Sequence, residues 1–227
     1  MSVLSVVDLK KSFPVRTGEI KVLDGISFSI EESEVVLIRG RSGAGKSTFL
    51  NIISGLETAT SGQVIFNGKS ITEMNLRQLA ELRATSIGII FQSFNLIPTW
   101  TALENVEAVL MHRGFSKTER REKAEKILTE LGLQDRFENL PSELSVGQQQ
   151  RVAIARTLVN SPSLILADEP TGDVDSETAS EIMELLMKRV KQDKVAMIIV
   201  SHGVFDDKYA DKVLCLKDGK FVEQSKE

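Results

Sequence analysis

Cysteine is nearly absent from this chain of 227 residues, in which Cys215 stands alone. A single thiol excludes an internal disulfide framework and a cysteine-based zinc cluster, and it is typical of proteins kept in a reducing compartment. Because Cys215 falls within the strand-like run Val213–Leu216, we interpret it as a small buried hydrophobic residue.

An excess of positive charge is also missing. The chain has 28 Lys and Arg against 32 Asp and Glu, which gives a net charge of −4 and an isoelectric point near 5.5. Dedicated nucleic-acid binders usually carry a basic excess, so we expect no nucleic-acid partner. A content of 41% hydrophobic and 26% charged residues is that of an ordinary globular protein and excludes disordered and collagen-like chains.

Long apolar runs are missing as well. The longest, Val195–Val200, has the length of a strand and is far shorter than the ~20 residues that a membrane-spanning helix needs. Residues 1–13 also lack the order of basic, apolar and small residues that marks a signal peptide. We therefore expect a cytoplasmic protein, which can still dock onto a membrane protein.

Short β-type runs flank helical ones along the chain, and several of these runs are almost continuously apolar. Such runs are typical of strands that are covered on both faces, as in the parallel sheet of an α/β fold. The predicted strands are Val3–Asp8, Ser27–Ile30, Val35–Arg39, Val64–Phe66, Ile87–Phe91, Leu164–Asp168, Val195–Ser201 and Val213–Leu216.

Helical signals are clearest in the middle of the chain. Ser116 and Glu119 form a capping-box pattern, and Gly132 ends the apolar stripe that follows. That stripe consists of Ala124, Ile127, Leu128 and Leu131. A second helix is predicted over Ser176–Val190, with inward-facing residues Ile182, Met183, Leu186 and Val190. We interpret residues from about 93 to 160 as a helical subdomain inserted into a single domain that spans residues 1–227.

A glycine-rich motif follows the apolar strand Val35–Arg39 and precedes a helical segment. It matches the phosphate-binding pattern G-x-x-x-x-G-K-[ST], in which backbone N–H groups and a helix N-terminus surround phosphate oxygens. Lys46 is expected to reach the β- and γ-phosphates, and the Ser47 hydroxyl to ligate Mg²⁺. The predicted nucleotide-binding residues of this loop are Gly40, Arg41, Ser42, Gly43, Ala44, Gly45, Lys46, Ser47 and Thr48.

Two acidic residues, Asp168 and Glu169, follow the apolar strand Leu164–Ala167. A carboxylate at the tip of such a strand is costly unless it has a partner, and Mg²⁺ on the phosphates is a suitable partner for Asp168. Glu169 is then placed to polarise the water that attacks the γ-phosphate. The alternative is a simple turn at the end of the strand, before Pro170.

The segment Leu144-Ser145-Val146-Gly147-Gln148 resembles the signature motif of the ATP-binding-cassette (ABC) ATPases. The order of the motifs along nearly the whole chain also resembles that family, namely the phosphate loop, Gln92, the signature, Asp168-Glu169, Asp175 and His202. The stretches 88–98, 101–106 and 168–172 are similar to the macrolide-exporter, lipoprotein-release and cell-division subfamily. The resemblance implies an α/β P-loop NTPase core with a mostly parallel sheet, an antiparallel β subdomain and an inserted helical subdomain.

The resemblance also implies roles for single residues. Phe13 takes the place of the aromatic residue that stacks on adenine, although it could simply be a packed residue at a strand end. Gln92 resembles the glutamine that ligates Mg²⁺ and senses the γ-phosphate, and His202 the histidine that contacts the γ-phosphate. Asp175 resembles the aspartate that communicates between two opposed sites, and it is also a good N-cap for the following helix.

The signature motif is expected to begin a helix. Ser145 is a good N-cap and Gln148, three residues later, completes a capping box. In the family, Ser145, Gly147 and Gln148 would contact the γ-phosphate held by a second copy of the chain, so the implied partner is a second ATPase subunit that encloses two ATP molecules with Mg²⁺. Spacing alone does not indicate this arrangement.

The chain departs from the family pattern at three places. Val146 replaces the usual Gly, Gly172-Asp-Val-Asp175 replaces the usual Gly-Asn-Leu-Asp, and Gly203 follows His202 where Asp is common. We expect ATP binding to be intact. The departures bear on the hydrolysis rate and on whether two identical chains pair.

The leading hypothesis is the ATP-hydrolysing subunit of a transporter, peripheral on the inner face of the cell membrane. Because the chain reaches Glu227 shortly after its last strand-like segment, we expect the permease to be a separate chain. Its docking surface is predicted around Phe94, Leu96, Ile97 and Trp100, which could instead belong to the core of the helical subdomain. An ATP-driven mechanical switch at the membrane stays open as an alternative. A DNA-maintenance ATPase lacks support because no heptad run is present, and a translation-factor ATPase would carry two cassettes.

Overall fold

A six-stranded sheet forms the centre of the computed structural model, which describes residues 2–16, 18–202 and 205–222. Its strand order is β10-β9-β3-β8-β7-β6, with only β10 antiparallel to its neighbour. The bounds are β3 Val35–Arg39, β6 Ile87–Ile90, β7 Leu164–Asp168, β8 Ala196–Ser201, β9 Lys212–Lys217 and β10 Lys220–Val222. The predicted parallel sheet is therefore confirmed. Cys215 lies on β9 but is only partly buried, so its interpretation as a buried residue was wrong.

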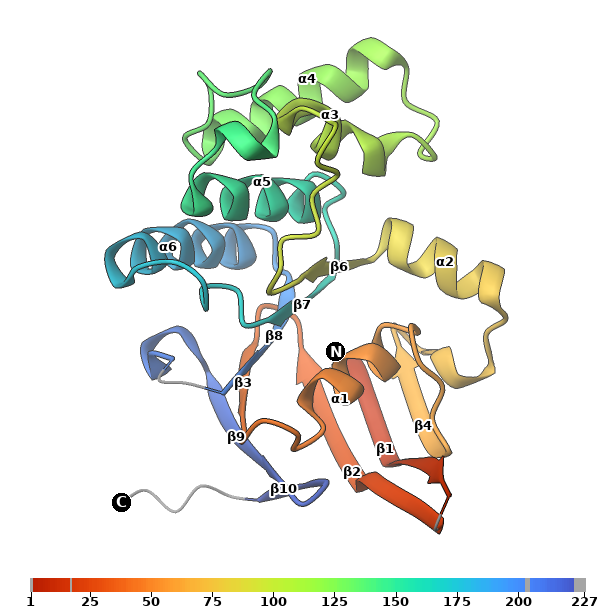
Figure 1. Cartoon of the computed structure of the whole chain (residues 1–227). Helices are drawn as coiled ribbons and strands as arrows, with labels where there is room; N and C mark the ends of the chain where they lie inside the picture. Colours follow the sequence, from red (N-terminus) through yellow and green to blue (C-terminus); the bar gives the residue numbers. More distant parts are fainter. Residues whose placement is uncertain (1, 17, 203–204, 223–227) are drawn as a thin grey trace.

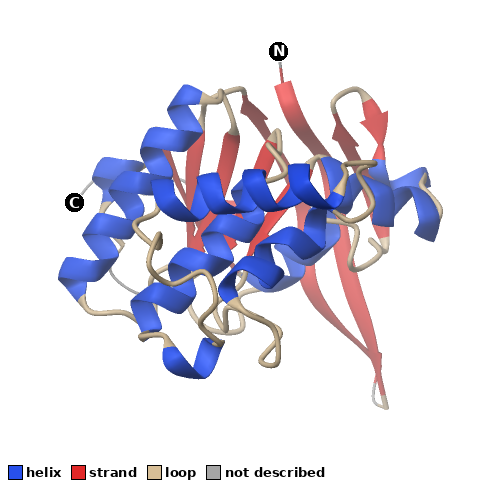
Figure 2. Cartoon of the chain, turned by 90° about the horizontal axis from the view of Figure 1, so that it is seen from above, coloured by secondary structure: helices blue, strands red, loops and turns tan. Residues whose placement is uncertain are grey.

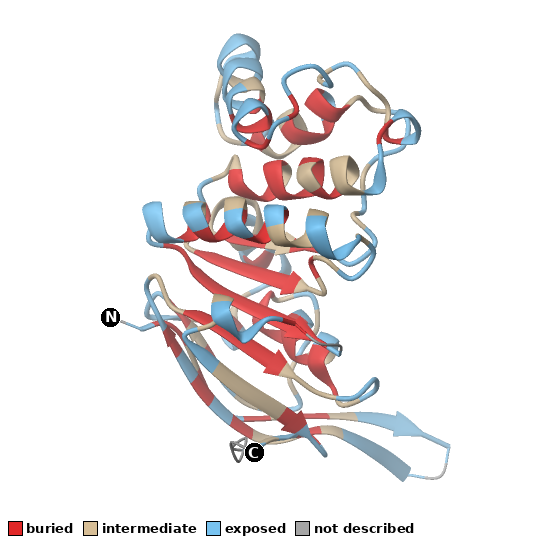
Figure 3. Ribbon diagram, turned by 90° about the vertical axis from the view of Figure 1, so that its left-hand side faces the viewer, coloured by how far each residue is buried: buried red, intermediate tan, exposed pale blue. Residues whose placement is uncertain are grey.

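A second, antiparallel sheet has the order β2-β1-β4-β5 and lies beside α1 (Figure 1). Its strands are β1 Ser2–Val15, β2 Gly18–Glu31, β4 Ser61–Phe66 and β5 Lys69–Ser70. The predicted strands at Val3–Asp8 and Ser27–Ile30 were therefore much too short. Main-chain pairing continues to Val15 and Gly18, where exposed side chains give the sequence no burial pattern to read (Figure 3).

Four helices, α3 to α6, cover one face of the six-stranded sheet, and Figure 2 shows the helical layer from above. Between β6 and β7 the chain forms helices and no strand. The α-helices are α1 Lys46–Ile53, α2 Leu76–Thr85, α3 Ala102–Glu107, α4 Lys117–Glu130, α5 Val146–Leu158 and α6 Ser176–Gln192. Single 3₁₀ turns occur at η1 Ile71–Glu73, η2 Ala108–Leu110, η3 Pro141–Glu143 and η4 Asp207–Tyr209. Among the helices of the described residues, none is long and apolar enough to cross a membrane.

Strand β3 is buried on both faces, which explains its unbroken apolar sequence. Val35 and Leu37 join the core beneath the helices, whereas Val36 and Ile38 join the core shared with α1 and the antiparallel sheet. Because successive side chains of a strand point to opposite faces, an unbroken apolar run needs cover on both sides. The packing on both faces holds β3 in place, and Gly40 follows directly after its last residue, Arg39.

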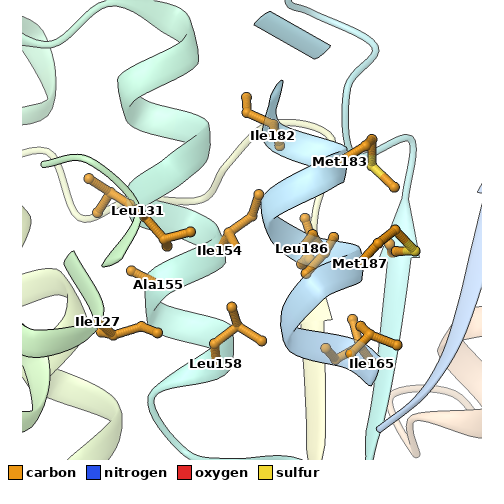
Figure 4. Packing of buried hydrophobic residues seen from close by; sticks show 14 of the residues in the cluster. Ile127, Leu131, Ile154, Ala155, Leu158, Ile165, Ile182, Met183, Leu186 and Met187 are labelled. Carbon is orange, nitrogen blue, oxygen red and sulfur yellow. The ribbon is translucent and has the colours of Figure 1, made fainter. Parts of the chain in front are cut away.

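The helical side of the core depends on α5, which packs between α4 and α6 (Figure 4). Ile154 and Leu158 of α5 lie in one cluster with Leu186 of α6 and Ile165 of β7. The predicted inward stripes of α4 and α6 are all buried. Gly132 adopts a positive φ of 75° just after α4 ends, as expected of a helix stop. This packing sets the N-terminus of α5 at a fixed place relative to the sheet.

Candidate active site

The glycine-rich loop joins β3 to α1 and folds tightly because its glycines have no side chains. Gly43 and Gly45 adopt positive φ angles of 79° and 101°, a region that favours glycine. A Cβ at Gly40 would lie 2.6 Å from the Leu216 carbonyl oxygen, and one at Gly45 would lie 2.9 Å from the Val22 carbonyl oxygen. Gly45 is the N-cap of α1 without a side-chain cap, so the first N–H groups of the helix remain available to an anion.

Lys46 is the first residue of α1 and is buried, with 7% of its surface exposed. Its Nζ donates to the Gly40 carbonyl oxygen at 2.8 Å and to the Arg41 carbonyl oxygen at 3.2 Å. An ammonium has three N–H donors, and these two bonds hold the charge against the loop. The lysine is thereby fixed beside the main-chain groups of the phosphate loop.

Asp168, at the end of β7, accepts a hydrogen bond from the Ser47 hydroxyl at 3.0 Å. Burial raises the pKa of the Asp168 carboxyl, and neighbouring Glu169 adds to the rise, whereas the Ser47 bond and Lys46 oppose it. A carboxylate in this setting gains from a cation. Ser47, Asp168 and Gln92 line one cavity, and each has a side-chain oxygen, the kind of ligand that Mg²⁺ prefers. The residues present therefore fit a magnesium ion that also binds phosphate.

Glu169 follows Asp168 in a left-handed conformation, with a φ of 49°. Its N–H donates to the Val200 carbonyl oxygen at 3.0 Å, and its own carbonyl accepts from Gly172 N–H at 3.1 Å. The Glu169 carboxylate contacts His202 Nδ1, with 11% of the glutamate side chain and 57% of the histidine side chain exposed. Non-glycine residues in this region are uncommon and cluster at functional sites, and here the geometry turns the carboxylate toward His202.

These residues share one cavity of about 450 Å³, which we call the phosphate-loop cavity. Its lining consists of Val22, Ser42, Gly43, Gly45, Lys46, Ser47, Thr48, Gln92, Asp168, Glu169 and His202. The other predicted loop residues, Gly40, Arg41 and Ala44, line an adjoining cavity of about 650 Å³. The structure thus brings together segments that lie as far apart in the sequence as Val22 and His202.

The signature motif lies at the N-terminus of α5. Ser145 Oγ accepts from Gln148 N–H at 3.3 Å, and Gln148 Oε1 accepts from Ser145 N–H at 3.0 Å, which completes the predicted capping box. Val146 is 46% exposed. A Cβ at Gly147 would lie 2.6 Å from Thr178 Cγ2 on α6, so glycine is required here for close helix packing.

Asp175 is the N-cap of α6, where its Oδ1 accepts from Thr178 N–H at 3.0 Å. That hydrogen bond lowers the pKa of the Asp175 carboxyl. Together with the signature residues, Asp175 lines a separate cavity of about 520 Å³ that shares no residue with the cavity at the phosphate loop. The two halves of the predicted site therefore lie apart within one chain.

The comparisons with known proteins decide the family. Residues 23–172 match the family model described as ABC transporter. An ABC transporter ATP-binding protein of Thermotoga maritima is 42% identical over 96% of this chain and 93% of its own. The chain belongs to the ABC transporter family. The ATP-binding protein YtrE of Bacillus subtilis is 45% identical over 86% of this chain and 83% of its own. MacB of Brucella melitensis, a macrolide export ATP-binding/permease protein, is 42% identical over 96% of this chain, which spans only 34% of MacB.

A solved structure agrees with this family. The dimeric ATP-binding cassette MJ0796, in a post-hydrolysis state bound to ADP and Pi, superposes with a TM-score of 0.90 at 41% identity over 97% of both chains. The ABC ATPase cassette fold expected from the sequence is thereby confirmed. The chain is an ATP-binding cassette in which the phosphate loop lines one cavity and the signature lines another.

Two parts of the cassette's site differ from the simplest expectation. Phe13 lies on β1 opposite Ile20, with Lys11 Nζ 4.6 Å from the centre of its ring, and it lines neither cavity at the phosphate loop. Its stacking on adenine stays a prediction. Val22 lines the phosphate-loop cavity although no motif marked it. Its neighbour Leu23 and its own carbonyl abut Gly45, a contact between distant segments that leaves no local pattern in the sequence.

Proposed function

We propose that this chain is the ATP-hydrolysing subunit of a transporter, in which two copies enclose two ATP molecules and drive a separate permease at the inner face of the membrane. The observation that carries the proposal is the division of the site. Lys46, Asp168 and Glu169 share one cavity, while Ser145 and Gly147 line another. A phosphate bound at the phosphate loop of one copy would therefore contact the signature residues of a second copy.

Within one copy, the phosphate loop would hold the nucleotide. The free N–H groups at the start of α1 and the Lys46 ammonium would bind phosphate oxygens. Ser47, Asp168 and Gln92 would hold Mg²⁺, which neutralises the charge that develops on the phosphates. Asp168 suits this role because its carboxylate is partly desolvated and lies close to Glu169, whose like charge adds to the rise of the Asp168 pKa.

Glu169 would orient and deprotonate the attacking water. Its carboxylate is mostly buried beside Asp168 and contacts His202, and its left-handed backbone directs it into the cavity rather than along β7. The Glu169–His202 contact would keep the carboxylate in one orientation, which general-base catalysis requires. His202, which is more exposed, would in turn lie against the γ-phosphate.

Two comparisons support the assembly. The solved MJ0796 cassette is dimeric with ADP and Pi, and MacB by its name joins an ATP-binding part to a permease. The loop after Gln92 offers a docking surface for the permease, because Ile97 is 38% exposed while Leu96 packs against the core. The substrate of transport is left unassigned.

The substitution Glu169→Gln tests this function. It keeps the side-chain volume and removes the base, so steady-state ATP hydrolysis should fall by ~10²–10⁴-fold while ATP still binds. The variant should elute as a dimer from a size-exclusion column equilibrated with ATP and Mg²⁺, and as a monomer without nucleotide. Glu184→Gln, on the exposed face of α6, serves as the matched control. A Glu169→Gln variant that stays monomeric at high protein and ATP concentration would contradict the two-copy site.

A further inference from the structure

The last turn of α5 contacts the chain on both sides of Gln92. Before Gln92, the Thr157 hydroxyl donates to the Ile89 carbonyl oxygen at 3.0 Å. After it, Arg156 Nη2 donates to the Phe94 carbonyl oxygen at 2.6 Å and Nη1 to the Asn95 carbonyl oxygen at 2.5 Å. Two adjacent residues of one helix thus hold the segment that places Gln92 at the phosphate-loop cavity.

The Arg156 contact fixes an unusual piece of backbone. Phe94 and Asn95 are consecutive non-glycine residues with left-handed φ angles of 56° and 50°. This conformation is unfavourable for a bulky residue such as phenylalanine. It turns two successive carbonyl groups toward the guanidinium, whose planar donors can serve both at once. The hydrogen bonds to a charged group offset the cost of the turn.

Arg156 is committed to these carbonyls. Burial lowers the pKa of its guanidinium, and among the residues that the structure describes no carboxylate pairs with it. A half-buried arginine without a carboxylate depends on the carbonyl acceptors that it has. Thr157 adds a rigid support, because a Cβ at Gly88 on β6 would lie only 2.5 Å from Thr157 Cγ2.

Helix α5 begins at the signature and ends at this contact. Its 13 residues span roughly 20 Å at 1.5 Å per residue. We propose that Arg156 is a positioning residue, which holds the Phe94–Asn95 turn so that Gln92 faces the phosphate-loop cavity and which ties Gln92 to the signature helix. The inference rests on the proposed function, because only that function assigns Gln92 a role as a ligand of Mg²⁺.

The first test measures the affinity for a non-hydrolysable ATP analogue with and without Mg²⁺. Arg156→Met removes both donors, and supporting groups of this kind typically change metal affinity by about 10–100-fold. We therefore expect the Mg²⁺ concentration that promotes analogue binding to rise about tenfold, with affinity in the absence of Mg²⁺ unchanged. Arg120→Met is the matched control. Arg120 also donates to a main-chain carbonyl, that of Phe115, at 2.9 Å, but neither residue lines the phosphate-loop cavity.

A double-mutant cycle separates positioning from general damage. If Arg156 acts through Gln92, adding Arg156→Met to Gln92→Ala should change the Mg²⁺ requirement no further, since the two effects are not independent. Arg156→Lys keeps the positive charge but loses the planar pair of donors that reaches both carbonyls. Should the methionine variant fail to fold, the lysine variant carries the same test, with a smaller expected effect. An unchanged Mg²⁺ requirement in the folded variants, or an additive effect in the double mutant, would overturn the inference. A wild-type chain that binds no nucleotide would instead refute the proposed function.

Discussion

The substitution Gly147→Ala tests whether packing against α6 fixes the signature helix. A Cβ at this position would lie 2.6 Å from Thr178 Cγ2, well inside van der Waals contact. Threonine has a single stiff χ1 angle, so the methyl group cannot move away without a change of rotamer or a shift of the helices. Over-packing of this kind typically costs about 1–3 kcal/mol.

An opposing effect must be subtracted. Alanine is favoured over glycine inside a helix by up to about 1 kcal/mol, and Gly147 is the second residue of α5. The net loss of unfolding free energy should therefore be about 0–2 kcal/mol, which lowers the melting temperature of a chain of this size by up to roughly 8 °C. Thermal unfolding followed by circular dichroism measures it.

The matched variant is Gly147→Ala combined with Thr178→Ser. Serine lacks the Cγ2 methyl group that causes the clash, and it keeps the backbone N–H that Asp175 caps. The double variant should regain most of the lost stability. If stability returns but ATP hydrolysis does not, Gly147 is also needed at the phosphate. A single Gly147→Ala variant that melts above the wild type would refute the packing argument.

Three further outcomes are expected. Lys46→Ala should weaken ATP binding by roughly 10-fold or more, because a charge-assisted donor is lost, as titration with labelled ATP will measure. Val146→Gly should change ATP hydrolysis by less than about tenfold, since Val146 is exposed at the start of α5; a rise of about a hundredfold would indicate an impaired signature and an asymmetric pair. The lowered pKa of Asp175 means that its cap stabilises the protein above the ordinary pKa of aspartate and is lost as pH falls through the folded-state value. Asp175→Asn should keep the cap and flatten that part of the acid unfolding curve.

The parts of the fold that the sequence predicts well are those with burial on both faces or a local capping pattern. Val35–Arg39 and Leu164–Asp168 match β3 and β7 residue for residue, because side chains buried on both sides leave an unbroken apolar run. The predicted first strand ended at Asp8, whereas β1 continues through the buried Leu9 and Lys11 to an exposed end at Phe13–Val15. Helix α2 was missed although Asn75 and Gln78 form a capping box, since its sequence is polar and only Leu79 is buried.

The residues of the site also differ in how well the sequence predicts them. The phosphate loop, Asp168 and the signature carry local patterns that reflect direct chemistry, and the structure brings the first two together at the Ser47–Asp168 hydrogen bond. Contacts made to main-chain carbonyls have no such pattern. The bonds from Arg156 to Phe94 and Asn95 join residues about sixty positions apart, and any loop carbonyl could have been the acceptor. Positioning residues of this type become visible only in three dimensions.

Helix α5 brings these contacts into one rigid element. Near its start, Gly147 packs against Thr178 on α6. One turn later Gln150, which is 1% exposed, donates to the carbonyl of Pro170, the residue after Glu169. At its end Arg156 holds the turn after Gln92. Each contact is either close packing or a hydrogen bond to the main chain, and a densely packed interior transmits such displacements instead of absorbing them. A shift of the signature end of α5 would therefore move the supports of Glu169 and Gln92 together.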